Sequence, residues 1–368
     1  MKKCLTLIAA LIFLCSSLSA FAEENKPLLS EERLRTLATV QKLSGYDDGL
    51  NLYTMEVFYD YNIDHLTPAG DITDQEMVSL ILNEALPGVP VQIEAPNFGC
   101  TAFTLKTDDG KVYMGRNYDF KFDTSAMMCF CHPENGYDSV CFSALSNLGF
   151  SDPFASEANM AASLAAPLIP LDGMNEKGLA IAVLTLPSEP THQNNGKPKL
   201  TTPILIRLVL DRCATTQEAI DLIAQYDYIA TSGRDYHYYI TDASGDGRVV
   251  EWDCEKADRP MVVTPLRTIT NYFAMYEDRI ISGQSNGIYG QGKERRDKAE
   301  AVMDTAGSAA EKETAWDCLK AASTAPNPES IISNTQWSVV YSISDLTHEF
   351  TLHRHWEDRF SFDTLAQQ

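Results

Sequence analysis

The sequence is poor in basic residues and lacks the common motifs of several enzyme classes. Its 368 residues include 29 Lys and Arg against 51 Asp and Glu, which gives a formal net charge of −22 at pH 7. Nucleic acid and anionic membrane surfaces should repel so acidic a chain, so neither is an expected partner. No metalloprotease helix motif, P-loop or dinucleotide fingerprint occurs, and we predict no metal or other cofactor.

Long apolar stretches are missing after the first 22 residues. That segment combines the basic Lys2 and Lys3, a short apolar run and the small-residue pattern Ala20-Phe21-Ala22, which is typical of a signal peptide (1–22) removed on export. The apolar run is too short to cross a bilayer comfortably, and we expect no membrane span. We therefore predict an exported protein, periplasmic or extracellular. Loss of residues 1–22 removes two lysines and no acids, so the formal charge changes from −22 to −24.

Cysteine is not scarce, but its number is odd. Nine cysteines occur, and seven remain after the two in the signal segment are removed. An exported chain permits disulfides, and an odd number leaves at least one thiol free or paired between chains. Cys129-Phe130-Cys131-His132 is a candidate metal or redox site. However, two thiols one residue apart lack the usual zinc spacing, so disulfide pairing or free thiols are the favoured interpretations.

The hydrophobic pattern predicts an α+β fold. Before residue 100 it indicates helices over residues 30 to about 44 and Thr73–Leu86, with a strand at Leu52–Tyr59 between them. Two further helices are expected to start at Pro203 and at a Thr215/Glu218 capping box. Strands are predicted at Cys100–Leu105, Val112–Asp119, Leu179–Leu184, His237–Thr241, Arg248–Trp252, Trp337–Ile343 and Phe350–Arg354. Antiparallel hairpins with helices grouped between them favour α+β layers over alternating βαβ units.

The first hairpin brings candidate catalytic residues together. If its turn at Asp109-Gly110 has two residues, Cys100 faces Asp119 across the ladder and Arg116 lies on the opposite face. A loop of odd length would break this register. Taken alone, Cys100 is more simply a small buried residue that opens a strand, and Gly115–Phe120 a solvated strand end.

Several short motifs follow one another along the chain. They are Gly99–Phe103, Val112–Phe120, Asp172–Leu179, His237–Asp242 with Glu251, Thr268–Tyr272, Glu294–Ala299 and Trp337–Tyr341. Their order and spacing, from about Asn97 to Phe362, resemble the choloylglycine hydrolase family. This family covers bile salt hydrolases and penicillin V acylases, with N-acylethanolamine acid amidase and acid ceramidase as relatives. The resemblance implies an N-terminal-nucleophile hydrolase, an αββα four-layer sandwich of two antiparallel sheets between helices.

The resemblance also implies catalytic roles. In the family the nucleophilic cysteine is the first residue of the mature catalytic chain, which matches Cys100. The other roles are the arginine and aspartate of a Gly-Arg-Asn-x-Asp motif, an oxyanion-hole asparagine, a second arginine, and a backbone N–H for the oxyanion. The motif arginine and aspartate match Arg116 and Asp119, and the oxyanion-hole asparagine matches Asn271. The second arginine matches Arg295, and the backbone N–H matches that of Thr185.

Two of these matches have simpler alternatives. The loop before Arg295 is hard to align, and Arg296 is only one step away. Asn271 could be a turn amide, and Arg295 a solvated helix residue.

Elementary chemistry explains why such a set would work. A free α-amino group has a pKa near about 8, so it can take the thiol proton without a separate histidine. The thiolate of Cys100 would attack an amide carbonyl and form a thioester, which water then hydrolyses. In this scheme Asp119 would hold the amine, Arg116 would favour the thiolate, and Asn271 would donate to the oxyanion.

Two features depart from the compact family members. Thr185 stands where bile salt hydrolases usually carry asparagine and penicillin V acylases tyrosine, so bile salt cleavage is not implied. Residues 23–99 are an addition, predicted to be a prosegment or a small N-terminal subunit before the catalytic domain 100–368. Attack of Cys100 on the Gly99 carbonyl, by an N-to-S acyl shift, or a processing protease would free the amine.

The predicted function is hydrolysis of a linear, non-peptide amide bond in a small N-acyl compound. Acyl transfer to an amine on the same scaffold is one alternative, and a catalytically silent exported binding module is another. The oligomeric state stays open, with a homo-oligomer among the alternatives.

Overall fold

The computed structural model describes residues 29–364, apart from 45, 47–48, 88–98, 282, 285–286, 290–291, 328 and 330–333. The predicted signal peptide (1–22) lies outside the described residues. Within the described ranges, no helix has both the length and the apolar character needed to cross a bilayer.

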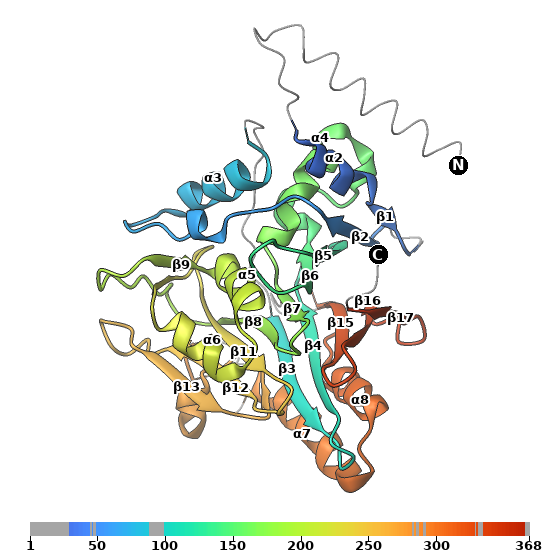
Figure 1. The fold of residues 1–368 in the computed structure, drawn as a ribbon. Coiled ribbons are helices and arrows are strands. Elements are labelled where there is room, and N and C mark those ends of the chain that lie inside the picture. The colour runs from blue at the N-terminus through green and yellow to red at the C-terminus, as the bar shows by residue number, and fades with distance from the viewer. Residues whose placement is uncertain are drawn as a thin grey trace, which may run out of the picture.

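Two β-sheets lie at the centre of the molecule (Figure 1). The larger sheet has the order β1 (Gln41–Lys42), β2 (Leu52–Val57), β5 (Ala126–Cys131), β6 (Ser139–Ala144), β7 (Asp172–Asn175), β8 (Ala180–Leu186), β11 (Asp235–Thr241), β12 (Arg248–Trp252) and β13 (Met261–Pro265). The smaller has the order β14 (Thr268–Ile269), β3 (Gly99–Lys106), β4 (Val112–Asp119), β15 (Thr335–Ser342), β16 (Thr347–Leu352) and β17 (Phe360–Asp363). Neighbouring strands run antiparallel in both sheets except β2 and β5, which are parallel.

Side chains from the two sheets meet in a shared core. The hydroxyl of Tyr239 on β11 donates to Thr104 Oγ1 on β3 at 2.8 Å. Helices α5 (Thr202–Arg212) and α6 (Thr216–Ile223) pack on the larger sheet, whereas α7 (Lys293–Ala306) and α8 (Lys312–Ala322) pack on the smaller one. The predicted αββα order of layers is therefore confirmed.

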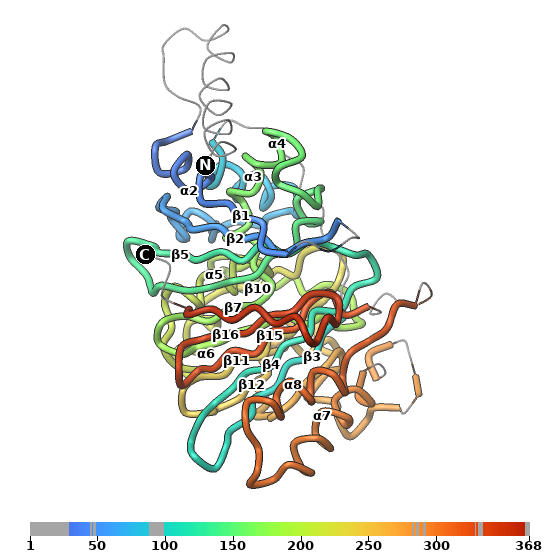
Figure 2. The backbone as a smooth tube through the Cα atoms, turned by 90° about the vertical axis from the view of Figure 1, so that its right-hand side faces the viewer, coloured from blue at the N-terminus to red at the C-terminus, as the bar shows by residue number. Residues whose placement is uncertain are grey.

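The remaining elements lie outside these four layers. They are α2 (Glu31–Ala38), α3 (Asp74–Ala85), α4 (Glu157–Ala162), the short parallel pair β9 (Lys199–Thr201) and β10 (Asp227–Ile229), and the 3₁₀ turns η2 (Ile63–Leu66), η3 (Leu145–Leu148), η4 (Pro153–Ala155), η5 (Ser163–Leu168), η6 (Ala274–Arg279) and η7 (Gly307–Ala309). Both views place α2, α3 and α4 at one end of the molecule and α7 and α8 at the other (Figure 2).

Local sequence signals predicted one helix well and two others only in part. Helix α3 starts at the expected place because Thr73 and Glu76 form a reciprocal capping box. The first helix is shorter than the predicted span of 30 to about 44, since it ends at Ala38 and Gln41–Lys42 pair with β2 instead. At α6, Thr215 caps the Glu218 N–H, but the Glu218 carboxylate accepts from Ala214, so only half of the predicted box forms.

The segment before residue 100 is built into the larger sheet. Strand β2 pairs with β5 from Leu52↔Ala126 to Val57↔Cys131, and all six of its residues are buried. The Tyr59 hydroxyl, just beyond it, donates to the Leu164 carbonyl oxygen at 2.5 Å. In the uncleaved chain, therefore, the described part of 23–99 shares a core with residues 100–368, and the boundary between them stays a prediction.

Candidate active site

The register of the β3–β4 hairpin decides which side chains meet. Beyond the two strands the Thr107 N–H donates to the Lys111 carbonyl oxygen at 2.9 Å, which extends the ladder by one pair. The loop therefore has three residues, Asp108 to Gly110, and Gly110 adopts a left-handed φ of +85°. A left-handed residue at the end of the loop is common in three-residue hairpin loops. Cys100 therefore pairs with Tyr118, and the predicted pairing with Asp119 is wrong by one position.

The shift of one position exchanges the two faces of the hairpin. Ala102 pairs with Arg116, so Arg116 shares the face of Cys100 and points between the two sheets. Its Nη2 donates to the Val183 carbonyl oxygen on β8 at 3.0 Å. Asp119 lies on the opposite face, where it pairs with Gly99. The expectation that Arg116 faces away from Cys100 is therefore also wrong.

Cys100 lies at the start of β3 with none of its surface exposed. Burial raises the pKa of its thiol to about 11, although a hydrogen bond and the positive charge of Arg116 oppose this shift. The backbone N–H of Cys100 donates to Asn271 Oδ1 at 2.7 Å. In the uncleaved chain the thiol is thus protonated at neutral pH, and the atom that would become the amine already has a side-chain partner.

Arg116 is held by a buried acid that has no role in the sequence analysis. Asp172 on β7 accepts from Arg116 Nε at 3.4 Å, from Trp337 Nε1 at 3.2 Å and from the Tyr341 hydroxyl at 2.5 Å. Asp172 opens the motif Asp172–Leu179, but only the stacking of β7 on β4 and β15 brings it to Arg116. Burial raises the pKa of this carboxyl, while Arg116 and the two other donors favour its ionised form.

Arg295, in the first turn of α7, lies at the centre of the other face. Its Nη1 donates to the Cys100 carbonyl oxygen at 3.1 Å, to Thr101 Oγ1 at 3.0 Å and to Asp119 Oδ2 at 2.8 Å. Its Nη2 donates to Asn271 Oδ1 at 2.6 Å. Arg296 instead pairs with surface acids such as Asp297, at 3.0 Å. The geometry therefore favours Arg295 over its neighbour.

Asp119 is connected to Cys100 by Arg295, which donates hydrogen bonds to both residues. Its carboxylate accepts from Arg295 and from Thr335 Oγ1, the latter at 2.7 Å, and burial raises its pKa. In the uncleaved chain, Asn271 rather than Asp119 holds the Cys100 nitrogen. In the uncleaved chain the register places the Asp119 carboxylate on the far face, where it contacts Arg295. Its contact with the free amine of the cleaved chain stays a prediction.

Asn271 joins the two sheets. Its Nδ2 donates to the Thr185 carbonyl oxygen at 2.9 Å and to Thr185 Oγ1 at 3.1 Å, at the end of β8. Its Oδ1 accepts from Cys100 on β3 and from Arg295 on α7. All six predicted residues (Cys100, Arg116, Asp119, Thr185, Asn271 and Arg295) therefore fall into one connected cluster, and their catalytic roles stay predictions.

The cysteine motif outside this cluster forms no metal site in the described part of the chain. Cys129 faces Cys141 across β5 and β6, and all the cysteines that the structure describes are free thiols. His132 turns away to bind Glu56 Oε1 at 2.5 Å and Asp138 Oδ2 at 3.1 Å. These contacts link β2 to the β5–β6 hairpin.

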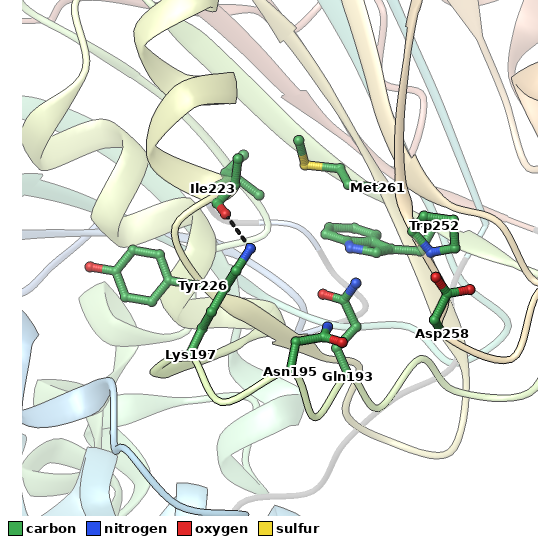
Figure 3. A pocket seen from close by; sticks show the side chains of 10 residues that line it. Gln193, Asn195, Lys197, Ile223, Tyr226, Trp252, Asp258 and Met261 are labelled. Atoms are coloured by element: carbon green, nitrogen blue, oxygen red, sulfur yellow. Dashed lines mark hydrogen bonds between the residues drawn. The ribbon is translucent and has the colours of Figure 1, made fainter.

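A cavity of about 240 Å³ lies elsewhere, between the end of α6, the loop before β9 and the β12–β13 turn (Figure 3). Tyr226, Trp252 and Met261 supply its apolar wall, and Lys197 Nζ at its edge donates to the Ala224 carbonyl oxygen at 2.7 Å. None of the six clustered residues lines it. It is therefore separate from the candidate catalytic cluster.

Comparison with known proteins finds a matching family model and similar solved structures. The model of the linear amide C-N hydrolases, choloylglycine hydrolase family, matches residues 100–262, starting at Cys100. Two structures of variants of conjugated bile acid hydrolase from Clostridium perfringens align with TM-score 0.54 and 16% identity, covering 72% of this chain and 92% of that chain. Penicillin V acylase from Agrobacterium tumefaciens aligns with TM-score 0.51 and 20% identity, covering 72% and 86%. These likenesses confirm the predicted fold and the predicted family resemblance.

Proposed function

We propose that this chain, a linear amide C-N hydrolase of the choloylglycine hydrolase family, is exported and uses Cys100 as an N-terminal nucleophile on a small N-acyl compound. Cleavage of the Gly99–Cys100 bond creates the working amine. Acyl transfer to the thiol then gives a thioester, and water completes the hydrolysis.

The main support is the placement of the Cys100 nitrogen and thiol. The nitrogen lies 2.7 Å from Asn271 Oδ1, and the thiol contacts Arg116 on the same face of the hairpin. In the uncleaved chain this nitrogen is an amide, which is no base, and burial keeps the pKa of the thiol at about 11. A freed amine, with a pKa near about 8, supplies the missing proton acceptor.

The cleavage step uses the same thiol and nitrogen of Cys100. The thiol sulfur attacks the Gly99 carbonyl carbon, the Gly99–Cys100 C–N bond breaks, and the thiol proton passes to the departing nitrogen. Water then hydrolyses the Gly99 thioester, which releases a carboxylate at Gly99 and leaves Cys100 with a free amine and a free thiol. Arg295, which holds the Cys100 carbonyl oxygen at 3.1 Å, fixes the chain on the side that stays.

The catalytic cycle uses the cluster in a second way. The amine of Cys100 takes the thiol proton, the sulfur attacks the substrate carbonyl carbon, and the proton passes to the leaving amine. The Asn271 amide and the Thr185 backbone N–H stabilise the oxyanion. Donors of this kind typically contribute about 3–4 kcal/mol to lowering the barrier.

The substrate class is an acyl amide. Conjugated bile acid and penicillin V are the substrates in the names of the two matched enzymes, and both are linear amides. N-acyl amino acids, N-acyl ethanolamines and acyl homoserine lactones share the same scissile bond. The distinct residue at Thr185, next to Asn271, argues against carrying over either named substrate without a test.

The N-terminal segment stays bound after cleavage. Six buried residues of β2 pair with β5, and His132 links Glu56 of β2 to Asp138 of the catalytic part. Removing β2 would expose this apolar strand and leave β5 with an open edge, so dissociation is strongly unfavourable. The mature protein is accordingly a complex of two pieces of one chain.

The decisive measurement is the intact mass of protein purified from the export compartment. We expect a break before Cys100 that Cys100→Ala abolishes, with release of acid and amine from a panel of fluorogenic acyl amides. Turnover by a chain still bonded at Gly99–Cys100 would refute the proposal. An unbroken chain with an inert thiol favours the silent binding module, and a new amide formed with added amine favours acyl transfer.

A further inference from the structure

Glu251 is a buried acid at the end of β12 that the proposed mechanism does not use. Its side chain has no exposed surface. Oε1 accepts from the Met275 N–H at 2.6 Å, and Oε2 accepts from the Ala274 N–H at 3.1 Å and lies 3.3 Å from His237 Nδ1. Burying a carboxylate is costly unless hydrogen bonds replace its water, and here two backbone N–H groups and an imidazole do so.

The two backbone groups belong to the segment that carries Asn271. This segment leaves the smaller sheet at β14, where Thr268 pairs with Phe103 and Ile269 with Ala102 on β3. Asn271 follows, and η6 starts at Ala274, where Glu251 of the larger sheet holds the chain. The chain on either side of Asn271 is thus attached to a sheet, to β3 of the smaller sheet before it and to Glu251 of the larger sheet after it.

The position of the Asn271 side chain depends on both of these attachments. Its side chain must reach the Cys100 N–H on one sheet, at 2.7 Å, and the Thr185 carbonyl oxygen on the other, at 2.9 Å. Hydrogen bonds weaken steeply once the donor–acceptor distance grows beyond about 3.2 Å. Release of the downstream attachment would let residues 270–275 drift, and a misplacement of about 1 Å can cost about 100-fold in rate.

We propose that Glu251, oriented by His237, is a positioning residue that holds the Ala274–Met275 turn and thereby keeps Asn271 between Cys100 and Thr185. The inference rests on the proposed function, because that function gives Asn271 its catalytic role. The competing explanation is that Glu251 only stabilises the fold by capping η6.

A matched control lies at the next acidic position after β12. The carboxylate of Asp253 accepts from the Tyr276 hydroxyl at 2.5 Å and from the Glu255 N–H at 3.0 Å, so it contacts the same η6 turn further from Asn271. Asp253→Asn therefore weakens η6 without loosening the backbone beside Asn271. Tm values of both variants report the shared structural effect.

The experiment measures kcat and KM of the cleaved enzyme on a fluorogenic acyl amide that the wild type hydrolyses. Glu251→Gln should lower kcat about 10- to 100-fold while KM changes less than about twofold. Asp253→Asn should leave both within about twofold. In an Asn271→Ala background, Glu251→Gln should lower kcat by less than about twofold further, because the residue through which it acts is gone.

Each outcome decides between the explanations. If the effects of Glu251→Gln and Asn271→Ala multiply, or if Asp253→Asn lowers kcat as much as Glu251→Gln does, Glu251 is structural and the inference is wrong. Full activity of Asn271→Ala would remove the role proposed for Asn271, a failure of the proposed function that the single variant alone reveals. Should Glu251→Gln not fold, Glu251→Asp gives the same comparison, since the shorter side chain keeps the charge but withdraws from both N–H groups.

Discussion

Asp172 and Arg116 form an ion pair sealed between the two sheets, with Oδ2 and Nε 3.4 Å apart and both side chains at 0% exposure. The pair connects β7 of the larger sheet with β4 of the smaller one, next to the Cys100 thiol.

Asp172→Asn should destabilise the protein strongly. Removing one partner of a buried pair leaves the other charge uncompensated, which typically costs about 3–5 kcal/mol. Urea unfolding measures the free energy of unfolding directly. Asp345→Asn is the control, because its pair with Lys111 is nearly half exposed and should contribute less than about 1 kcal/mol. Equal losses in the two variants would show that Asp172 does not balance a buried charge.

Gly115→Ala should also lower stability, for a steric reason. A Cβ at Gly115 would lie 2.1 Å from Cζ of the Phe103 ring across the β3–β4 ladder, so the packed ring would have to move. Overpacking of this kind typically costs about 1–3 kcal/mol. A Cβ at Gly70 meets nothing within 4 Å, so Gly70→Ala should leave the unfolding midpoint almost unchanged. A wild-type midpoint for Gly115→Ala would contradict the close approach.

His132 should stabilise the protein in a pH-dependent way. The hydrogen bond to Glu56, followed by that to Asp138, raises the pKa of His132 from 6.5 to about 9. A raised folded-state pKa means that the stabilisation is complete below about 6.5 and is lost as the pH rises through about 9. Wild type should therefore be more stable than His132→Gln at pH 6, and the gap should close by about pH 10 in urea unfolding curves.

A second histidine serves as the control for this effect. His65 is mostly exposed and pairs with Glu84 at 3.4 Å, so His65→Gln should show little change with pH. A gap between wild type and His132→Gln that is the same at pH 6 and pH 10 would mean that the imidazolium charge does not hold β2 to the hairpin.

Arg295→Lys should impair catalysis although the charge is kept. The planar guanidinium donates to four atoms at once, on Cys100, Thr101, Asp119 and Asn271. A lysine ammonium has no such fork, so we expect kcat to fall at least about tenfold. Arg296→Lys, one position along α7, should leave kcat within about twofold. If Arg296→Lys lowered kcat and Arg295→Lys did not, the role predicted for the second arginine would belong to Arg296.

Sequence reasoning located most elements and the whole cluster, but local signals failed at particular places. The capping box at Thr73 predicted α3 well, because Thr73 and Glu76 interact within one turn. The first helix was predicted too long, because the sequence of residues 39–44 carries no local signal that Gln41 and Lys42 pair with β2. The parallel pairing of β2 with β5 joins segments more than 70 residues apart, and no local pattern encodes it.

By itself the sequence determined the candidate nucleophile, the order of the motifs around it and the alternation of apolar residues that builds the layers, because these depend on residue type and on neighbours along the chain. Tertiary structure decided which side chains meet. A loop of three residues rather than two turned Arg116 toward Cys100 and Asp119 away from it, and the stacking of the sheets brought Asp172 to Arg116. Side chains along a strand alternate between the two faces of the sheet. One additional loop residue therefore shifts the register and changes which side chains of the two strands share a face. Residue type alone does not reveal the length of the loop.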